Sequence, residues 1–153
     1  MNNVAITQNH IPAMSAMAVE KVRQLENIVL SVPQTIIPTD HLFHAGIYAR
    51  TIMIPSGVVL TGALIEIATV LIVHGDCVVY IGEKAKELHG YNVLAASAGR
   101  KQAFVALADT YLTMLFATDA KTVEEAEDWF TDESDLLFSR AEYAINNVTI
   151  TGE

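Results

Sequence analysis

The sequence predicts a mainly β protein with a helix at each end. Between residues 39 and 118, apolar and polar residues alternate with a period of two, and turn signals interrupt the alternation about every 8 to 12 residues. On either side of this region, apolar residues recur at helical spacing instead. Short alternating strands joined by tight turns are typical of an antiparallel sandwich or barrel.

The length of the chain favours one domain with extensions. A chain of 153 residues that is 52% hydrophobic is long enough for one buried core and too short for two ordinary domains. We therefore expect an N-terminal arm and amphipathic helix over residues 1–38, a β-barrel over 39–118, and a C-terminal acidic helix and tail over 119–153.

The N-terminal region begins with a polar decapeptide and continues into a helix over residues 15–32. Ser15 is the expected N-cap, and Pro33 ends the helix because proline lacks the backbone N–H that the helix needs. The apolar stripe is narrow, so the helix packs either on the barrel or on a neighbouring subunit. Its members are Met14, Val22, Leu25 and Val29.

The central region divides into strands and turns by its alternation and its Gly, Pro, Asp and Ser residues. The expected strands cover residues 42–54, 57–66, 67–73, 77–82, 91–97, 102–107 and 110–117. The expected turns lie at 55–57, 74–76, 82–84, 97–101 and 108–110.

The C-terminal region opens with a capping box, in which Thr122 is followed three residues later by Glu125. Acidic residues crowd the first turns of this helix, where the helix dipole favours them, so the acidic cluster has a structural explanation. The stretch 134–153 is either an arm that adds a strand to a neighbour or a loose tail. The expected buried stripe of the helix is Val123, Ala126, Trp129 and Phe130.

Charge and cysteine content exclude several classes of protein. The formal net charge is −9 and the basic residues are scattered, whereas a nucleic-acid surface needs clustered Lys and Arg. Cys77 is the only cysteine, so no intramolecular disulfide forms, which fits a reducing compartment. The sequence shows no secretion signal and no uninterrupted apolar run of about 18 residues. We expect a soluble protein that contacts neither nucleic acid nor membrane directly.

A series of short motifs follows in a fixed order and spacing from the central region into the C-terminal helix. Its residues are Tyr48, Arg50, Pro55, Gly57, Thr61, Gly62, Gly75, Ser97, Gly99, Lys101, Asp109, Thr110 and the Glu-rich helix 122–130. With these motifs the stretch 48–118, about half of the chain, resembles the cupin superfamily, and more closely a group of small cupin-like proteins of tailed bacteriophages and prophages. One position departs from the pattern, because the family more often has Thr or Ala where this chain has Arg100.

The resemblance implies an antiparallel double-stranded β-helix, the cupin-type jelly-roll barrel. It also implies where metal ligands would lie: two early histidines at Ile65 and Thr69, a glutamate near Ala68, and a late histidine at Phe116. None of these side chains is a strong ligand. We therefore expect a barrel filled with apolar side chains, with no metal and no cofactor.

The histidines present give little support for another metal site. His41 and His44 are three residues apart, which places them on opposite faces of an extended strand. His10, His74 and His89 lie in an arm, a turn and a connection, where surface or hydrogen-bonded roles are expected. If a non-standard metal site exists, its residual candidate ligands are His41, His44 and Glu66, brought together within one chain or between subunits.

No other catalytic arrangement is evident. Ser56 lies in a turn rather than a nucleophile elbow, and Cys77 resembles a small core residue. Asp109 is most simply a turn aspartate, and Tyr48 with Arg50 is most simply a surface pair. We therefore expect no catalytic residues and no enzymatic activity.

The functional expectation follows from the resemblance. It is a non-enzymatic, metal-independent bacteriophage protein, virion-associated or in the host cytoplasm, that is a structural or accessory component and acts through protein contacts. We expect the chain to form a homo-oligomer. We also expect it to contact other phage or host proteins. Two alternatives remain: an inhibitor of a host defence protein, and a degenerate cupin enzyme or small-ligand binder with a non-standard metal site.

Overall fold

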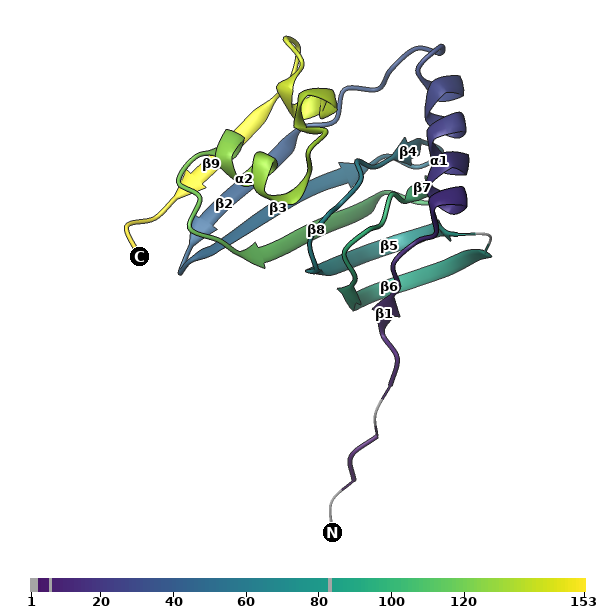
Figure 1. The fold of residues 1–153 in the computed structure, drawn as a ribbon, viewed down its shortest axis with the longest axis horizontal. Coiled ribbons are helices and arrows are strands. Elements are labelled where there is room, and N and C mark those ends of the chain that lie inside the picture. The colour runs from purple at the N-terminus through teal and green to yellow at the C-terminus, as the bar shows by residue number, and fades with distance from the viewer. Residues whose placement is uncertain (1–2, 6, 83) are drawn as a thin grey trace.

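The computed structural model describes residues 3–5, 7–82 and 84–153, and it shows a long curved sheet with two helices (Figure 1). The helices are α1 (Ala16–Val29) and α2 (Val123–Phe130). Two short 3-10 turns follow α2, at Ser134–Leu136 and Phe138–Arg140. The strands are β1 (His10–Ile11), β2 (Thr39–His44), β3 (Ile47–Ile54), β4 (Val59–Thr61), β5 (Thr69–Ile81), β6 (Lys84–Ala96), β7 (Ala103–Ala106), β8 (Thr110–Ala117) and β9 (Asn146–Ile150).

The sheet confirms the predicted mainly β, antiparallel fold class. Its described strands are ordered β1-β6-β5-β8-β3-β2-β9, while β7 pairs with both β5 and β4. Only β1 and β9 join their neighbours in parallel. The sheet does not close on itself, so the predicted barrel is open, with β1 and β9 at the ends of the main strand order and β4 at the edge beside β7.

Several predicted strand boundaries are wrong. The predicted strand 42–54 is two strands, β2 and β3, joined by a two-residue turn at Ala45 and Gly46. Both residues have positive φ angles, 52° and 70°, as a type I′ hairpin turn requires. The predicted strand 57–66 shrinks to β4, and the predicted strand 91–97 extends back to Lys84.

The predicted turn at 74–76 is instead a bend inside one long strand. Strand β5 pairs with β8 over its first half and with β7 over its second half, so it links the two parts of the sheet. A Cβ at Gly75 would lie 2.7 Å from Cα of Thr110, so only glycine allows this close approach. The Thr110 hydroxyl accepts a hydrogen bond from the backbone N–H of Asp76 at 3.2 Å, which fixes the bend.

Helix α1 forms as predicted and packs on the sheet of its own chain. The Ser15 hydroxyl accepts a hydrogen bond from the backbone N–H of Ala18 at 3.1 Å, which is the predicted N-cap. The helix contacts β4, and Val22 is buried on that side. The predicted contact with the sheet of the same chain is therefore present, and a contact of α1 with a neighbouring subunit stays a prediction.

Helix α2 is capped as predicted, and Val123, Ala126 and Phe130 of the predicted stripe pack on the core while Trp129 does not. The Thr122 hydroxyl accepts a hydrogen bond from the backbone N–H of Glu125 at 3.2 Å. Ala126 and Phe130 enter the core, whereas Trp129 is half exposed. Glu127 takes the buried position instead, because the helix phase set by Ala126 and Phe130 turns Glu127 inward.

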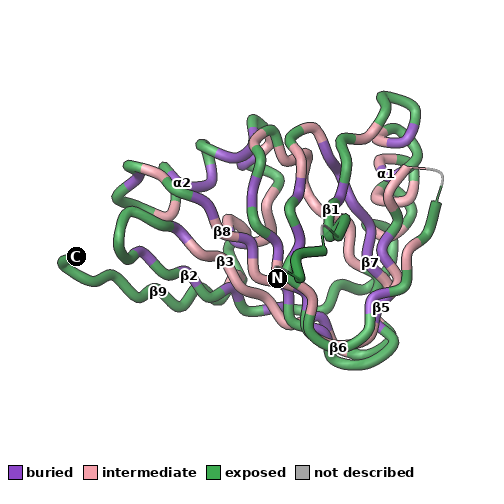
Figure 2. Tube along the Cα trace, turned by 90° about the horizontal axis from the view of Figure 1, so that it is seen from below, coloured by how far each residue is buried: buried purple, intermediate pink, exposed green. Residues whose placement is uncertain are grey.

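The two ends of the chain form two edges of the sheet. Residues 146–150, predicted as an arm to a neighbour or a loose tail, form β9 and pair in parallel with β2 of the same chain. Figure 2 shows β9 exposed along its length. At the opposite edge, Ile11 in β1 is buried, so the predicted polar arm ends in an ordered strand.

Candidate functional site

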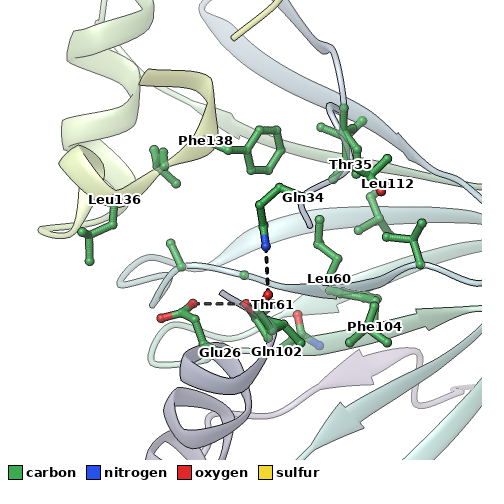
Figure 3. Close-up of a pocket in the computed structure, with 18 of the residues that line it drawn as sticks. Glu26, Gln34, Thr35, Leu60, Thr61, Gln102, Phe104, Leu112, Leu136 and Phe138 are labelled. Atoms are coloured by element: carbon green, nitrogen blue, oxygen red, sulfur yellow. Dashed lines mark hydrogen bonds between the residues drawn. The ribbon is translucent and has the colours of Figure 1, made fainter. Parts of the chain in front are cut away.

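A pocket of about 650 Å³ opens on the concave side of the sheet. One wall consists of Leu60 in β4, Phe104 in β7 and Leu112 in β8 (Figure 3). The opposite side is formed by the segment that follows α1 and by Leu136 and Phe138. The volume lies within the range of about 300–1,000 Å³ that is typical of small-molecule sites.

Most of the charged residues that line the pocket are paired. Lys101 Nζ lies 2.9 Å from Glu26 Oε2 and also donates to the carbonyl oxygen of Gly62 at 2.8 Å. Arg50 lies 2.8 Å from Glu127, and Glu133 lies 2.7 Å from Arg23. These pairs tie α1 and the C-terminal segment to the sheet.

Arg100 is the exception among the charged residues of the pocket. Its side chain is only 1% exposed, and none of the ion pairs among the described residues includes it. The guanidinium donates to the carbonyl oxygen of Ser97 at 2.8 Å and to the hydroxyl of Thr69 at 2.7 Å. Burial lowers its pKa to about 10, which leaves it charged at neutral pH.

Two buried N–H donors that line the pocket have no hydrogen-bond partner among the described residues. They are Nε of Arg100 and the side-chain Nε2 of Gln102. Arg100 and Gln102 are separated by Lys101 in the segment that leads into β7, and the Gln102 carbonyl accepts a hydrogen bond from Gly62 N at 2.8 Å. Buried polar groups are ordinarily paired, so these two donors lie unused beside the pocket.

A second buried polar cluster, centred on Glu127, lies beside the pocket. Glu127 is 1% exposed and accepts from Arg50 at 2.8 Å, from Arg140 Nε at 2.9 Å, and from the Ser139 hydroxyl. Burial pushes the pKa of Glu127 upward, but the hydrogen bonds from Ser139 and Arg140 and the charge of Arg50 outweigh it. The pKa therefore lies below its ordinary value, and Glu127 is an ionised structural centre.

His41 continues this cluster to the edge of the sheet. Asn146 Nδ2 donates to the carbonyl of Ser139 at 2.9 Å, which leaves Asn146 Oδ1 to accept from His41 Nε2 at 2.7 Å. His41 Nδ1 then accepts from the Tyr48 hydroxyl at 2.7 Å. Burial lowers the pKa of His41, more than the Asn146 hydrogen bond raises it, so the ring is neutral. Both ring nitrogens are thus occupied by hydrogen bonds.

The candidate metal ligands do not converge. His44 is exposed on the opposite face of β2, as predicted, and its Nδ1 lies 2.7 Å from the Thr151 hydroxyl. Glu66 is exposed and accepts from the backbone N–H of Asp132 at 2.6 Å. Over the described residues, no group of three or more His, Cys, Asp or Glu side chains is placed to hold a metal ion.

The positions that the resemblance marks for ligands hold other contacts. Thr69 is buried and accepts from Arg100, and Ile65 bridges to Arg100 through the backbone at 2.8 Å. Phe116 packs edge-on against Tyr48, with ring centroids 5.5 Å apart. Ala68 is exposed.

Of the other residues considered in the sequence, some have the predicted role and others lie in a different element. Cys77 is buried, and burial with the nearby Asp76 charge raises its pKa to about 11, so it is the predicted core residue. Asp109 accepts from Ser56 N at 2.9 Å, the predicted turn role. His74 and His89 lie within β5 and β6, not in a turn and a connection. His10 lies in β1, 2.6 Å from the Ser97 hydroxyl.

Sequence reasoning missed the residues that give the concave side its chemistry. Arg100 and Lys101 were not among the predicted site residues, yet both are buried and both line the pocket. Tyr48 and Arg50, predicted as a surface pair, belong to the buried cluster, with Arg50 3.4 Å from the Tyr48 hydroxyl. The only available signal was the departure at Arg100 from the Gly-Thr-Lys or Gly-Ala-Lys pattern.

Comparison with known proteins finds similarity in the solved structures alone. No protein-family profile matches the chain, and no curated protein matches it. A cupin superfamily protein from Desulfitobacterium hafniense aligns with a TM-score of 0.47 and 13% identity over 58% of this chain and 84% of that one. The cupin_2 domain of an XRE family transcriptional regulator from Enterobacter cloacae gives 0.45 and 9% over 57% and 100%.

A third similar structure is an RmlC-like cupin family protein with a double-stranded β-helix fold from Methanocaldococcus jannaschii. It aligns with a TM-score of 0.43 and 10% identity over 57% of this chain and 84% of that one. These three similar structures are cupin proteins, and the similarity concerns the fold, not an activity. Separately, no helix among the described residues is long and apolar enough to cross a membrane.

Proposed function

We propose that this protein is a non-enzymatic structural component that assembles through the convex face of its sheet. The observation that carries the proposal is the composition of this convex face, which is made by the outward residues of β6, β5, β8, β3 and β2. Three cross-strand rows cross it: Leu42–Ala49–Leu115–Val70–Ala95, Asp40–Thr51–Thr113–Ile72–Val93 and Met53–Tyr111–His74–Tyr91.

The three rows of the convex face are nearly free of charge. Asp40 is the one formally charged residue in the three rows, and it lies near an edge, bonded to Asn147 at 2.9 Å. The outermost residues remain open to solvent, with Tyr91 65% and Tyr111 52% exposed. Five strands about 4.8 Å apart make this face about 20 Å wide, an extent of apolar surface that marks interaction sites in soluble proteins.

A second copy of the chain is the occupant that the charge pattern favours. The chain carries a formal net charge of −9, so two copies repel each other at most of their surfaces. The three rows lack acidic residues apart from Asp40, and Asp76 and Glu87 lie on the outward side of β5 and β6 beyond the last row. Two copies that meet through the three rows therefore bring few like charges together. Two sheets packed face to face, about 10 Å apart, is the arrangement that sandwich proteins use internally.

The bacteriophage setting of the proposal rests on the resemblance of residues 48–118 to small phage and prophage cupin-like proteins. In that setting the protein is a virion-associated component, and its convex face contacts further copies or other phage proteins. The paired side chains on the concave side support a structural role, since they bind α1, α2 and β9 into one unit.

The mass of the assembly tests the proposal. Sedimentation velocity on the purified chain should show one oligomer, and Val70→Lys, at the centre of the convex face, should reduce it to a monomer. Leu107→Lys is the matched control, because Leu107 is exposed in the turn before β8 and lies outside the face. A wild-type monomer, or equal loss of assembly in both variants, would exclude assembly through this face.

Two further measurements separate the alternatives. Mass spectrometry of purified phage particles should detect the protein, whereas its absence from particles together with a stable complex with a host defence protein would favour the inhibitor. Elemental analysis of protein purified without a metal-affinity tag should find less than one metal per chain. One bound metal per chain, lost in His41→Ala, would favour the degenerate cupin enzyme.

A further inference from the structure

We propose that the pocket on the concave side binds an amphipathic anion, an apolar chain that ends in a carboxylate. The carboxylate would lie at Arg100 and Gln102, and the apolar chain would lie against Leu60, Phe104 and Leu112. The site lies on the opposite side of the sheet from the convex face and does not depend on assembly.

The charge of the pocket is the first argument for an anionic ligand. The other charged residues that line it, Glu26, Lys101, Arg50 and Glu133, each have an oppositely charged partner within 2.9 Å. Arg100 has only carbonyl, hydroxyl and thioether acceptors among the described residues. The pocket therefore holds one uncompensated positive charge, which a single carboxylate would neutralise.

The two donors without partners are the second argument, and they favour a carboxylate as the anionic group. A buried cation without a counter-ion costs folding free energy, as is seen when one partner of a buried ion pair is removed. Nε of Arg100 and Nε2 of Gln102 are both donors, and both lack partners among the described residues. A carboxylate has two oxygens and only accepts hydrogen bonds, so it matches this pair of donors.

The walls of the pocket are the third argument, and they favour a ligand with an apolar chain. Leu60, Phe104 and Leu112 form an apolar wall, with Leu136 and Phe138 across from the sheet (Figure 3). The remaining lining includes the uncharged polar residues Gln34, Thr35 and Thr61 and the paired charged residues. The apolar walls bury an apolar chain and repel a small hydrated anion such as inorganic phosphate. The combination selects an amphipathic molecule with one anionic group at its end.

Three ligands that share a ten-carbon chain test the charge preference. Calorimetric titration at pH 7.5, below the critical micelle concentration, would use decanoate, decan-1-ol and decyltrimethylammonium. Decanoate should bind one per chain and about tenfold or more tightly than decan-1-ol, because a hydrogen bond to a charged group is stronger than a neutral one. Decyltrimethylammonium should bind more weakly still. Equal affinities for all three would overturn the proposal.

A matched pair of variants tests the assignment to Arg100. Arg100→Met removes the charge and the Nε donor and should weaken decanoate binding about tenfold or more while decan-1-ol binding changes little. Lys121→Met removes the same charge at an exposed position outside the pocket and should leave both affinities unchanged. Equal weakening in the two variants would show a general charge effect and overturn the site.

The wild-type protein provides a readout that does not depend on the folding of Arg100→Met. The Nε–H resonance of Arg100, assigned by NMR, should shift on addition of decanoate and not on addition of decan-1-ol. Decanoate binding that leaves this resonance and the side-chain amide of Gln102 unmoved would place the ligand elsewhere and overturn the proposal.

Discussion

The buried carboxylate of Glu127 connects parts of the chain that are distant in sequence. It joins Arg50 from β3 with Arg140 and Ser139 from the C-terminal segment. We expect Glu127→Gln to lower the free energy of unfolding by about 3–5 kcal/mol at pH 7, because the substitution leaves the nearly buried Arg50 without its counter-ion. Urea denaturation followed by circular dichroism measures this loss.

The control for Glu127 uses another carboxylate that contacts Arg140. Asp135 lies 3.2 Å from Arg140, but its side chain is 97% exposed. We expect Asp135→Asn to change stability by about 0.5 kcal/mol or less, since exposed ion pairs contribute little. Similar losses in both variants would mean that burial of Glu127 is not the cause.

The low pKa of Glu127 also predicts a pH dependence. A carboxyl group whose pKa is lower in the folded chain stabilises the fold above its ordinary value of 4.5, and this contribution is lost as the pH falls through the folded pKa. The difference in stability between the wild type and Glu127→Gln should therefore be constant at neutral pH and shrink below about pH 4.5. A difference that grew with acidification would contradict the assigned ionisation.

Residue roles were predictable from the sequence only where the partner is local. The caps at Ser15 and Thr122 follow from residue type and short spacing, and both are present. Arg100 contacts Thr69, 31 positions away, and Glu127 contacts Arg50, 77 positions away, so no local pattern reveals these contacts. A charged residue at a buried position violates the pattern that sequence reasoning uses.

At the scale of elements, the turn between β2 and β3 contains a correctable strain. Ala45 has a φ of 52°, a conformation that costs an alanine about 1 kcal/mol and that asparagine tolerates better. We expect Ala45→Asn to raise the free energy of unfolding by about 0.5–1 kcal/mol, measured by thermal and urea denaturation. Gly46→Ala, with a φ of 70° at the other turn position, should lower it.

The bend in β5 depends on the absence of a side chain at Gly75. A Cβ there would lie 2.6 Å from the Thr110 hydroxyl and 2.8 Å from the carbonyl oxygen of Asp109, and the backbone atoms have no room to move. We expect Gly75→Ala to lower the free energy of unfolding by about 3 kcal/mol, as overpacking of a close contact does. Differential scanning calorimetry measures the change.

The control for the bend is Gly62→Ala. At Gly62 a Cβ would meet only the Gln102 carbonyl oxygen, at an ordinary contact distance of 3.5 Å, and the glycine has no positive φ. We expect a change of about 1 kcal/mol or less there. If both substitutions are equally tolerated, the approach of β8 to Gly75 is not what fixes the bend.

The type of most elements followed from periodicity, but their number and their lengths did not. Alternation identified every strand from β3 to β8 in outline, because side-chain direction alternates along a strand whatever its partner. The split at Ala45 was missed because Ala-Gly is a weaker turn signal than Asn-Gly. The merger of two predicted strands into β5 was missed because His74–Asp76 has turn-forming residues, although β8 and β7 hold it extended.

For the whole molecule, the open sheet means that the C-terminal strand protects an edge. Removal of β9 would expose the hydrogen-bonding groups of β2, which β9 covers over residues 39–43. It would also leave Nε2 of the buried His41 without its partner Asn146. The C-terminus is thus part of the fold, although nothing in its composition predicted this.

We expect truncation of residues 145–153 to lower the free energy of unfolding by about 3 kcal/mol or more and to cause aggregation. The first effect sums an unpaired buried nitrogen, about 1–3 kcal/mol, and the lost strand pairing. The second arises because an uncovered edge recruits strands from other chains. Asn146→Ala in the full chain separates the two: it should lower stability by about 1–3 kcal/mol while light scattering stays at the wild-type level. A truncated chain that scatters no more than Asn146→Ala would show that β2 tolerates exposure, and the role of β9 would then reduce to its single hydrogen bond with His41.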